Sequence, residues 1–315
     1  MDKHRVLLNG RLLPGVEARL AADYDLHRLA GERDPHAFLA AHGAEFVALV
    51  TSAGVGADAA LIDALPELRV ISNFGVGLDR IDLAAAARRG IAVGYTPDVL
   101  NDCVADLAFA LMLDVARGVS AGDRFVRRGD WPGGGFPLGR RVCGARLGIV
   151  GLGRIGRTIA RRADGFEMDV RYHSRRTVNG VPWRHEPELA ALARWADYLV
   201  VITAGGEGTR HLIDAGVLDA LGPDGFLINV ARGSVVDEAA LVRALAEGRI
   251  AGAALDVFER EPDVPAELFA LDNVVLVPHI ASATRETRDA MGERVLDNLR
   301  AFFAGGPMPS AALLP

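Results

Sequence analysis

Short apolar runs alternate with segments of helical period along the chain. Five runs occupy the first third of the sequence, at residues 6–8, 24–29, 46–50, 69–72 and 91–93. Strands that alternate with helices are typical of β-α-β units, whose strands lie parallel in one sheet. This part of the chain therefore predicts one open α/β sheet of five strands.

A second series of apolar runs begins near residue 147. Its six members are residues 147–150, 168–172, 198–202, 226–229, 252–257 and 274–277. Six parallel strands are the full number of a doubly wound dinucleotide-binding sheet. The second series thus predicts a second sheet with helices between its strands.

Two helical segments and one irregular segment connect and follow these series. Residues 98–116 carry apolar side chains at helical spacing just after Pro97, which predicts a long helix leaving the first domain. Residues 118–144, rich in Gly, Arg and Pro, fit neither period and predict an irregular arm. Residues 285–304 have a helical pattern that ends at Gly305. If this last helix packs on the first sheet, two crossings link the domains and make a hinged cleft.

Length and charge agree with a globular protein of two domains. A chain of 315 residues exceeds the size at which one core keeps growing, so we expect two domains. The net charge of −6 gives no sequence-independent attraction to nucleic acid or to an anionic membrane, because that attraction needs clustered Lys and Arg. The N-terminal ten residues lack a signal-peptide core, and no apolar run approaches the roughly 20 residues of a membrane span. We therefore expect a cytoplasmic protein.

Cysteine usage points to no special chemistry. Cys103 and Cys143 have no second Cys and no His at metal-ligand spacing. We expect two ordinary thiols and no metal site.

A glycine-rich turn follows the first strand of the second series. Residues 147–150 run directly into a helix through Gly151-Leu152-Gly153-Arg154-Ile155-Gly156. A G-x-G-x-x-G turn between a strand and a helix is typical of dinucleotide sites, because its glycines allow a tight turn, close approach of the pyrophosphate and close helix packing. We expect the phosphates at the amides of Arg154 and Ile155, at the positive helix end.

The end of the next strand favours one dinucleotide over the other. An NAD site usually has an acidic residue there, which accepts a hydrogen bond from the ribose 2′-hydroxyl. This strand instead ends in His173-Ser174-Arg175-Arg176. Two guanidinium groups and a hydroxyl suit a 2′-phosphate, so the sequence predicts NADPH as the preferred cofactor and NADH as a less preferred one. The alternative is that Arg175 and Arg176 are an ordinary solvated pair.

Three polar residues follow three strands of the second series. Arg232, Glu261 and His279 each come just after a predicted strand, where open α/β sheets bind ligands. Each alone is more typical of a surface or structural residue. Together they suit the reduction of a 2-keto acid, because Arg232 can bind the carboxylate and polarise the keto group while His279 delivers a proton. A neighbouring Glu261 would favour the imidazolium form of His279.

The chain resembles the D-isomer-specific 2-hydroxyacid dehydrogenases over nearly its whole length. The matching stretches are residues 72–79, 151–156, 229–234 with Asp237, 252–261 and 278–284. The resemblance implies a Rossmann cofactor domain and a flavodoxin-like substrate domain, both doubly wound parallel-sheet α/β domains, with a cleft between them. We place the substrate-binding (catalytic) domain at residues 1–98 and 286–315 and the dinucleotide-binding domain at residues 99–285. It also implies Arg232, Glu261 and His279 as the catalytic set.

The resemblance further implies the binding residues. Amides of Val76 and Gly77 would contact the substrate carboxylate, Asp256 would bind the nicotinamide carboxamide, and the cofactor would be lined by Val104, Thr203, Val230 and Ala231. We also expect Leu152 and Ala281 to contact the cofactor. Ser52 would help to shape the substrate pocket. Ser282 would either bind a substrate hydroxyl or cap the helix that follows. The arm around Trp131 and Phe136 usually wraps a second subunit in this family, so we expect a homodimer.

Within this family the chain looks like the NADPH-using glyoxylate and hydroxypyruvate reductases. The loop at residues 202–206 departs from the more usual Pro-Leu-Thr-Pro version, which leaves the adenosine contacts open. The predicted function is reduction of a small 2-keto acid, such as glyoxylate or hydroxypyruvate, to a D-2-hydroxy acid. The alternative is a catalytically silent dinucleotide-sensing protein of the corepressor type on the same scaffold.

Overall fold

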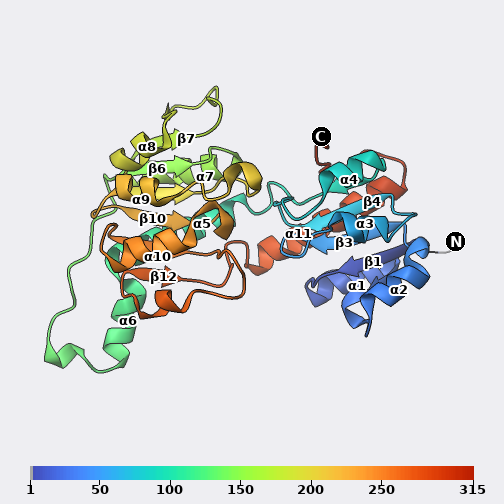
Figure 1. Ribbon diagram of the computed structural model, residues 1–315, viewed down its shortest axis with the longest axis horizontal. Coiled ribbons are helices and arrows are strands. Elements are labelled where there is room, and N and C mark those ends of the chain that lie inside the picture. The colour runs from blue at the N-terminus through green and yellow to red at the C-terminus, as the bar shows by residue number, and fades with distance from the viewer. Residues whose placement is uncertain (1–2) are drawn as a thin grey trace. The chain divides into compact units, whose positions relative to one another are not determined.

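The computed structural model describes residues 3–315, and it divides into two compact units (Figure 1). One unit combines the chain up to Leu100 with Thr284–Pro315, and the other comprises Asn101–Ala283. Met1 and Asp2, part of the segment searched for a signal peptide and of the first predicted domain, lie outside the described residues. The chain thus passes between the units twice. Which unit binds substrate and which binds dinucleotide remains a prediction.

The first unit contains a parallel sheet of five strands, as the apolar runs predict. The strands are β1 (Arg5–Asn9), β2 (Asp25–Arg28), β3 (Ala48–Ser52), β4 (Val70–Phe74) and β5 (Ala92–Gly94). Their order is β2-β1-β3-β4-β5, which is the flavodoxin-like order of a doubly wound sheet. Every residue of β4 is buried, so β4 lies within this unit's core.

Short helices connect these strands. They are α1 (Pro14–Asp23), α2 (Pro35–His42), α3 (Ala59–Asp63) and α4 (Leu83–Arg88), with 3-10 turns at Leu29–Gly31 and Gly43–Glu45. Pro14 and Pro35 occupy the first turn of their helices, where a missing N–H costs nothing. An aspartate side chain caps each of α2, α3 and α4 by accepting a hydrogen bond from a backbone amide of the first turn.

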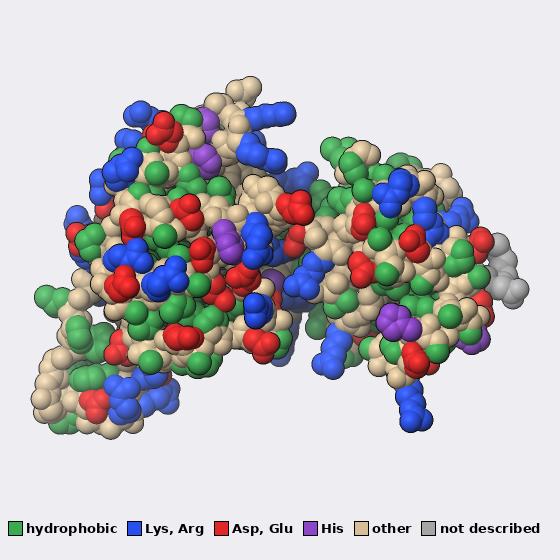
Figure 2. Space-filling model, viewed as in Figure 1, with side chains coloured by type: hydrophobic (Ala, Val, Ile, Leu, Met, Phe, Trp, Pro, Cys, Tyr) green, Lys and Arg blue, Asp and Glu red, His purple; other side chains and the backbone are tan. Residues whose placement is uncertain are grey.

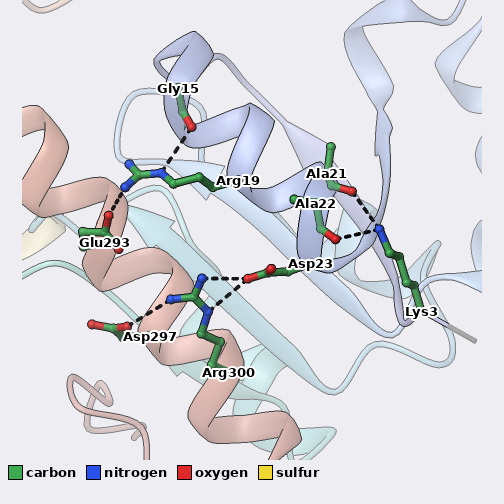
Figure 3. Close-up of polar contacts among 9 residues, drawn as sticks. All are labelled: Lys3, Gly15, Arg19, Ala21, Ala22, Asp23, Glu293, Asp297 and Arg300. Atoms are coloured by element: carbon green, nitrogen blue, oxygen red, sulfur yellow. Dashed lines mark hydrogen bonds and ion pairs between the residues drawn. The ribbon is translucent and has the colours of Figure 1, made fainter. Parts of the chain in front are cut away.

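The last helix, α11 (Arg285–Phe303), packs on the first sheet. The hydroxyl of Ser72 in β4 donates to the carbonyl of Val295, 223 residues further along the chain. On another side, α11 meets α1: Arg300 pairs with Asp23 at 2.7 Å, and Arg19 pairs with Glu293 (Figure 3). The two ends of the chain therefore build one unit.

The second unit contains seven parallel strands. They are β6 (Arg146–Val150), β7 (Asp169–His173), β8 (Arg184–His185), β9 (Tyr198–Val201), β10 (Phe226–Asn229), β11 (Gly252–Leu255) and β12 (Val274–Leu276), in the order β12-β11-β10-β9-β6-β7-β8. The prediction of six strands was wrong by one. It missed β8, because two residues at a sheet edge make no apolar run. With β8 as the third strand, the sheet has the Rossmann order followed by one extra strand.

Six helices flank or extend this sheet. They are α5 (Asn101–Arg117), α6 (Val119–Arg127), α7 (Arg154–Ala163), α8 (Leu189–Trp195), α9 (Ala215–Leu221) and α10 (Glu238–Ala246), with 3-10 turns at Trp131–Gly133, Asp164–Phe166, Glu207–Thr209, Gly233–Val235 and Ala266–Ala270. The predicted start of α5 at residue 98 was too early, because Asp98 has a left-handed backbone with φ 71°. Across residues 3–315, no helix has both the length and the apolar character of a membrane span.

The arm is more regular than the sequence predicts. Residues 118–144 were expected to be irregular, but α6 occupies Val119–Arg127. Gly118 separates it from α5 with a left-handed φ of 63°. None of the residues of α6 is buried, so this short helix packs no side chain into the core of the unit.

Charged side chains of both signs are interspersed over the face that Figure 2 displays. Basic residues do not form a continuous band on this face.

Candidate active site

The glycine turn between β6 and α7 has the backbone geometry that a pyrophosphate requires. Gly151 has φ 104°, and a Cβ there would lie 2.8 Å from the backbone of Thr203. A Cβ at Gly156 would overlap the carbonyl of Gly151, whereas one at Gly153 would meet nothing within 4 Å. The space over Gly153 is thus open to a ligand. This space lies at the start of α7. Backbone amides in the first turn of a helix have no acceptor within the helix, which is why helix N-termini bind anions.

The turn after β7 presents two arginines to solvent. Arg175 and Arg176 are exposed, and neither guanidinium forms an ion pair within residues 3–315. The hydroxyl of Ser174 donates to the carbonyl of Arg176 at 2.7 Å, so it would have to rotate away from that carbonyl to donate to a phosphate oxygen. These residues fit a dinucleotide that carries a 2′-phosphate, because the turn offers cationic donors and no carboxylate.

The other predicted cofactor residues all belong to the second unit. Thr203 lies against Gly151, and Val230 and Ala231 are buried directly after β10. The remaining three are Leu152, Val104 of α5 and Ala281, all of which are also buried.

The three predicted catalytic residues follow neighbouring strands. Arg232, Glu261 and His279 come after β10, β11 and β12, which pair side by side in the sheet. Nδ1 of His279 lies 2.8 Å from Oε2 of Glu261. Arg232 lies close enough for its charge to act on Glu261, and its Nη1 donates to the carbonyl of Ala231 at 2.7 Å. The structure therefore brings these groups together at one edge of the sheet.

Glu261 is held in its ionised form. Burial by itself raises the pKa of the Glu261 carboxyl, but four interactions with three neighbouring residues outweigh it. They are the hydrogen bond from His279, the charge of His279, the amide of Phe258 at 3.1 Å and the charge of Arg232. The net result is a lowered pKa of Glu261, so a carboxylate faces Nδ1 at neutral pH. Since a carboxylate only accepts, Nδ1 carries a proton and Nε2 faces outward from the pair.

A buried carboxylate holds the His279 loop in place. Asp256 has no exposed surface, and its two oxygens accept the amides of Ile280 at 2.6 Å and Ala281 at 3.0 Å. Its own carbonyl accepts the amide of His279, whose backbone has φ 52°, a region in which His is enriched. Burial raises the pKa of Asp256, although these two amides lower it in part. The family resemblance implied only a nicotinamide contact for Asp256, and this structural role was not predicted.

A second acidic group that the sequence analysis missed, Glu259, connects the loop after β11 with the loop after β9 and with α10. The carboxylate of Glu259 binds Arg210 at 2.7 Å and His211 at 3.2 Å. Its backbone amide donates to Glu238 at 3.1 Å. A Cβ at Gly233 would overlap the backbone of Phe258, so the Arg232 loop packs directly on the Glu261 loop. The sequence has two glutamates here, Glu259 and Glu261, on either side of Arg260. Only Glu261 was predicted to have a role.

The predicted substrate contacts lie on both units. In the first unit, Val76 and Gly77 follow β4, and Nδ2 of Asn73 donates to the carbonyls of Gly75 at 3.2 Å and Gly77 at 3.0 Å. Ser52 ends β3 in the same unit.

Ser282 belongs to the second unit and is half-buried. The alternative that Ser282 caps α11 was wrong. Thr284 occupies the cap and accepts the amide of Thr287 at 3.3 Å, since it stands directly before the first helical residue.

Known proteins resemble this chain over its full length. Residues 109–281 match the family model described as D-isomer specific 2-hydroxyacid dehydrogenase, NAD binding domain. Glyoxylate/hydroxypyruvate reductase A of Arabidopsis thaliana is 46% identical over 97% of both chains. Hydroxyphenylpyruvate reductase of Plectranthus scutellarioides is also 46% identical, over 98% of both chains. The solved NADPH-dependent glyoxylate/hydroxypyruvate reductase of Sinorhizobium meliloti, in complex with NADP and malonate, superposes with a TM-score of 0.91 at 42% identity, covering 99% of this chain and 97% of that one.

Removing the Asp256 carboxylate tests its role as a brace. In Asp256→Ala, the amides of Ile280 and Ala281 lose their acceptors, so we expect the free energy of unfolding to fall by about 1–3 kcal/mol for each amide. Urea denaturation followed by fluorescence measures this loss. Asp263→Ala removes an exposed carboxylate of the same segment and serves as the control. Equal stability of the two variants would contradict the role.

Proposed function

The chain belongs to the D-isomer specific 2-hydroxyacid dehydrogenase family, and we propose that it reduces small 2-keto acids to D-2-hydroxy acids with NADPH as the preferred donor. Glyoxylate and hydroxypyruvate are the proposed substrates. The observation that carries the proposal is the Glu261–His279 pair, joined at 2.8 Å in the unit that also contains the glycine turn. Relatives named as reductases of these acids support it.

In the proposed reaction, His279 is the proton donor. Nδ1 donates to Glu261, so Nε2 of the imidazolium is the atom that gives a proton to the keto oxygen. The reduced nicotinamide, when bound, supplies the hydride. The ionised Glu261 stabilises the positive charge of the imidazolium before transfer and keeps the ring oriented afterwards.

Arg232 is proposed to bind the substrate and polarise it. A guanidinium is always charged and offers several donors in one plane, which suits a carboxylate with a neighbouring keto oxygen. Arg232 already acts electrostatically on Glu261. The same positive charge favours the negative charge that develops on the keto oxygen.

The amides of Val76 and Gly77 are proposed to bind the substrate carboxylate from the first unit. Within residues 3–315, no acceptor is found for either N–H, and Asn73 holds the carbonyls of Gly75 and Gly77. Free amides on a braced loop suit an anion. Ser52 and Ser282 are proposed to shape the substrate pocket.

The proposed cofactor site uses the glycine turn for the pyrophosphate and Ser174, Arg175 and Arg176 for the 2′-phosphate. Open space over Gly153 and the two exposed guanidinium groups support it. NADH, which lacks the phosphate, gains nothing from these arginines. It is therefore proposed as the weaker donor.

Two copies of the chain are proposed to associate through the arm. Trp131 and Leu138 are 67% and 102% exposed, and α6 has no buried residue. Large apolar side chains exposed together are typical of a surface that another protein covers. Arms of this family wrap a second subunit, which supports a homodimer.

The main alternative is a dinucleotide-sensing protein without turnover. Mixing the purified chain with NADPH and glyoxylate or hydroxypyruvate, and following the absorbance of the reduced nicotinamide, separates the two. We expect consumption of NADPH with at least one of these acids. A constant signal across a panel of 2-keto acids, with the dinucleotide still bound, would favour the sensor.

The proton donor is tested with His279→Ala. We expect turnover to fall by a factor on the order of 10² to 10⁴, because the keto oxygen loses its general acid. Binding of NADPH, measured by fluorescence titration, should persist. His42→Ala, which removes an imidazole of the first unit paired with Glu45, should leave turnover unchanged. Turnover retained in His279→Ala would remove this residue from the reaction.

The cofactor preference is tested with the double variant Arg175→Ala, Arg176→Ala. Loss of charge-assisted hydrogen bonds to the 2′-phosphate should raise KM for NADPH roughly ten- to hundredfold and change KM for NADH little. Steady-state kinetics with both donors measures the split. Arg194→Ala, an exposed arginine of α8, is the control. Equal changes with both donors would overturn the assignment.

The proposed dimer is tested with Leu138→Asp. A charge on this exposed apolar site should convert a dimer into a monomer in size-exclusion chromatography with light scattering. Val55→Asp, at an exposed apolar site of the first unit, should leave the mass unchanged. A wild-type chain that elutes as a monomer at micromolar concentration would rule the dimer out.

A further inference from the structure

The two-residue strand β8 places a histidine beside the arginine-bearing turn. β8 pairs with β7 in parallel, with Tyr172 opposite His185. The rings of these two residues lie 5.1 Å apart. The turn that carries Arg175 and Arg176 starts just after β7, so β8 lies next to it along the sheet edge.

His185 contacts the turn on both sides of the arginines. Nε2 lies 3.0 Å from the carbonyl of Ser174, and Nδ1 lies 3.1 Å from the hydroxyl of Thr177. Since a carbonyl only accepts, Nε2 carries the proton in the first contact. The imidazole therefore bridges the residue before the arginine pair and the residue after it.

Further hydrogen bonds fix the backbone at the two ends of this turn, and none of them involves the guanidinium groups of Arg175 and Arg176. The hydroxyl of Tyr172 accepts the amide of Val178 at 2.9 Å, and the amide of Glu186 in turn donates to the carbonyl of Tyr172 at 2.7 Å. Arg175 and Arg176 themselves remain exposed. The backbone of the turn is thus fixed while its two guanidinium groups stay available.

We propose that His185 is a positioning residue for recognition of the 2′-phosphate. It does not touch the phosphate. It holds Ser174 and Thr177 so that the two guanidinium groups converge on one anion, which lowers the conformational entropy lost on binding. This inference rests on the proposed preference for NADPH and extends it to a residue on a neighbouring strand.

The test compares two small probes of the adenosine end of the cofactor. Adenosine 2′,5′-bisphosphate carries the 2′-phosphate, and 5′-AMP lacks it. In calorimetric titrations we expect His185→Ala to lower the affinity for the bisphosphate about three- to tenfold, because one or two hydrogen bonds that fix the turn are lost. The affinity for 5′-AMP should stay unchanged. KM should rise for NADPH alone, with kcat for NADH unaltered.

Two further variants make the test independent of folding defects. His185→Gln keeps a donor for the carbonyl of Ser174 and should restore most of the bisphosphate affinity. Thr177→Val removes the Nδ1 contact from the other side and should give a selective loss even if His185→Ala does not fold. His42→Ala is the matched histidine control in the first unit.

Failure of this inference differs from failure of the proposed cofactor preference. If the wild-type chain binds both probes equally, the preference for NADPH is wrong and the positioning role falls with it. If the wild-type chain prefers the bisphosphate and the His185 and Thr177 variants keep that preference, the positioning role alone is overturned. Equal weakening of both probes would also overturn it, since it would indicate general damage to the site.

Discussion

The parallel pairing of β10, β11 and β12 is the constraint on which the candidate chemistry depends. Neighbouring strands lie about 4.8 Å apart, so the loops at their carboxyl ends necessarily meet. Arg232, Glu261 and His279 occur in three such loops, although they are 29 and 18 residues apart in sequence. Proximity alone does not orient an imidazole, and the buried carboxylate of Asp256 supplies what is missing by holding the amides after His279.

Charged groups are arranged differently at the two ends of the candidate dinucleotide site. At the loops of Arg232, Glu261 and His279, opposite charges lie close together, and their pairing outweighs the effect of desolvation on the pKa of Glu261. At the turn after β7, the arginines are exposed, and water and salt weaken their charges. Geometry must then contribute more of the selectivity, which explains why a brace such as His185 would matter there.

The first unit depends on contacts between the two ends of the chain. Ser72 bonds to Val295, and Arg300 and Arg19 connect α11 with α1. β4, which leads into the loop of Val76 and Gly77, is therefore supported by a helix that the chain makes last.

The sequence by itself determined the features that depend on neighbours along the chain. Short apolar runs identified the strands of both sheets except β8, and the glycine spacing identified the turn before α7. The absence of a carboxylate after β7 was also readable, because it needs only the position of a strand end.

Only the tertiary structure decided features that depend on contacts between distant segments. The edge strand β8 has only two residues, which is too short to show a hydrophobic period. The helix α6 lies within a segment rich in Gly, Arg and Pro and has no buried residue. The brace at Asp256, the cluster at Glu259 and the cap at Thr284 are single hydrogen-bonding groups, and their partners are chosen by packing. The sequence does not show whether an Asp or Glu side chain is exposed to solvent or buried beneath a loop. Burial, which makes a hydrogen-bond partner necessary, is decided only when the chain folds.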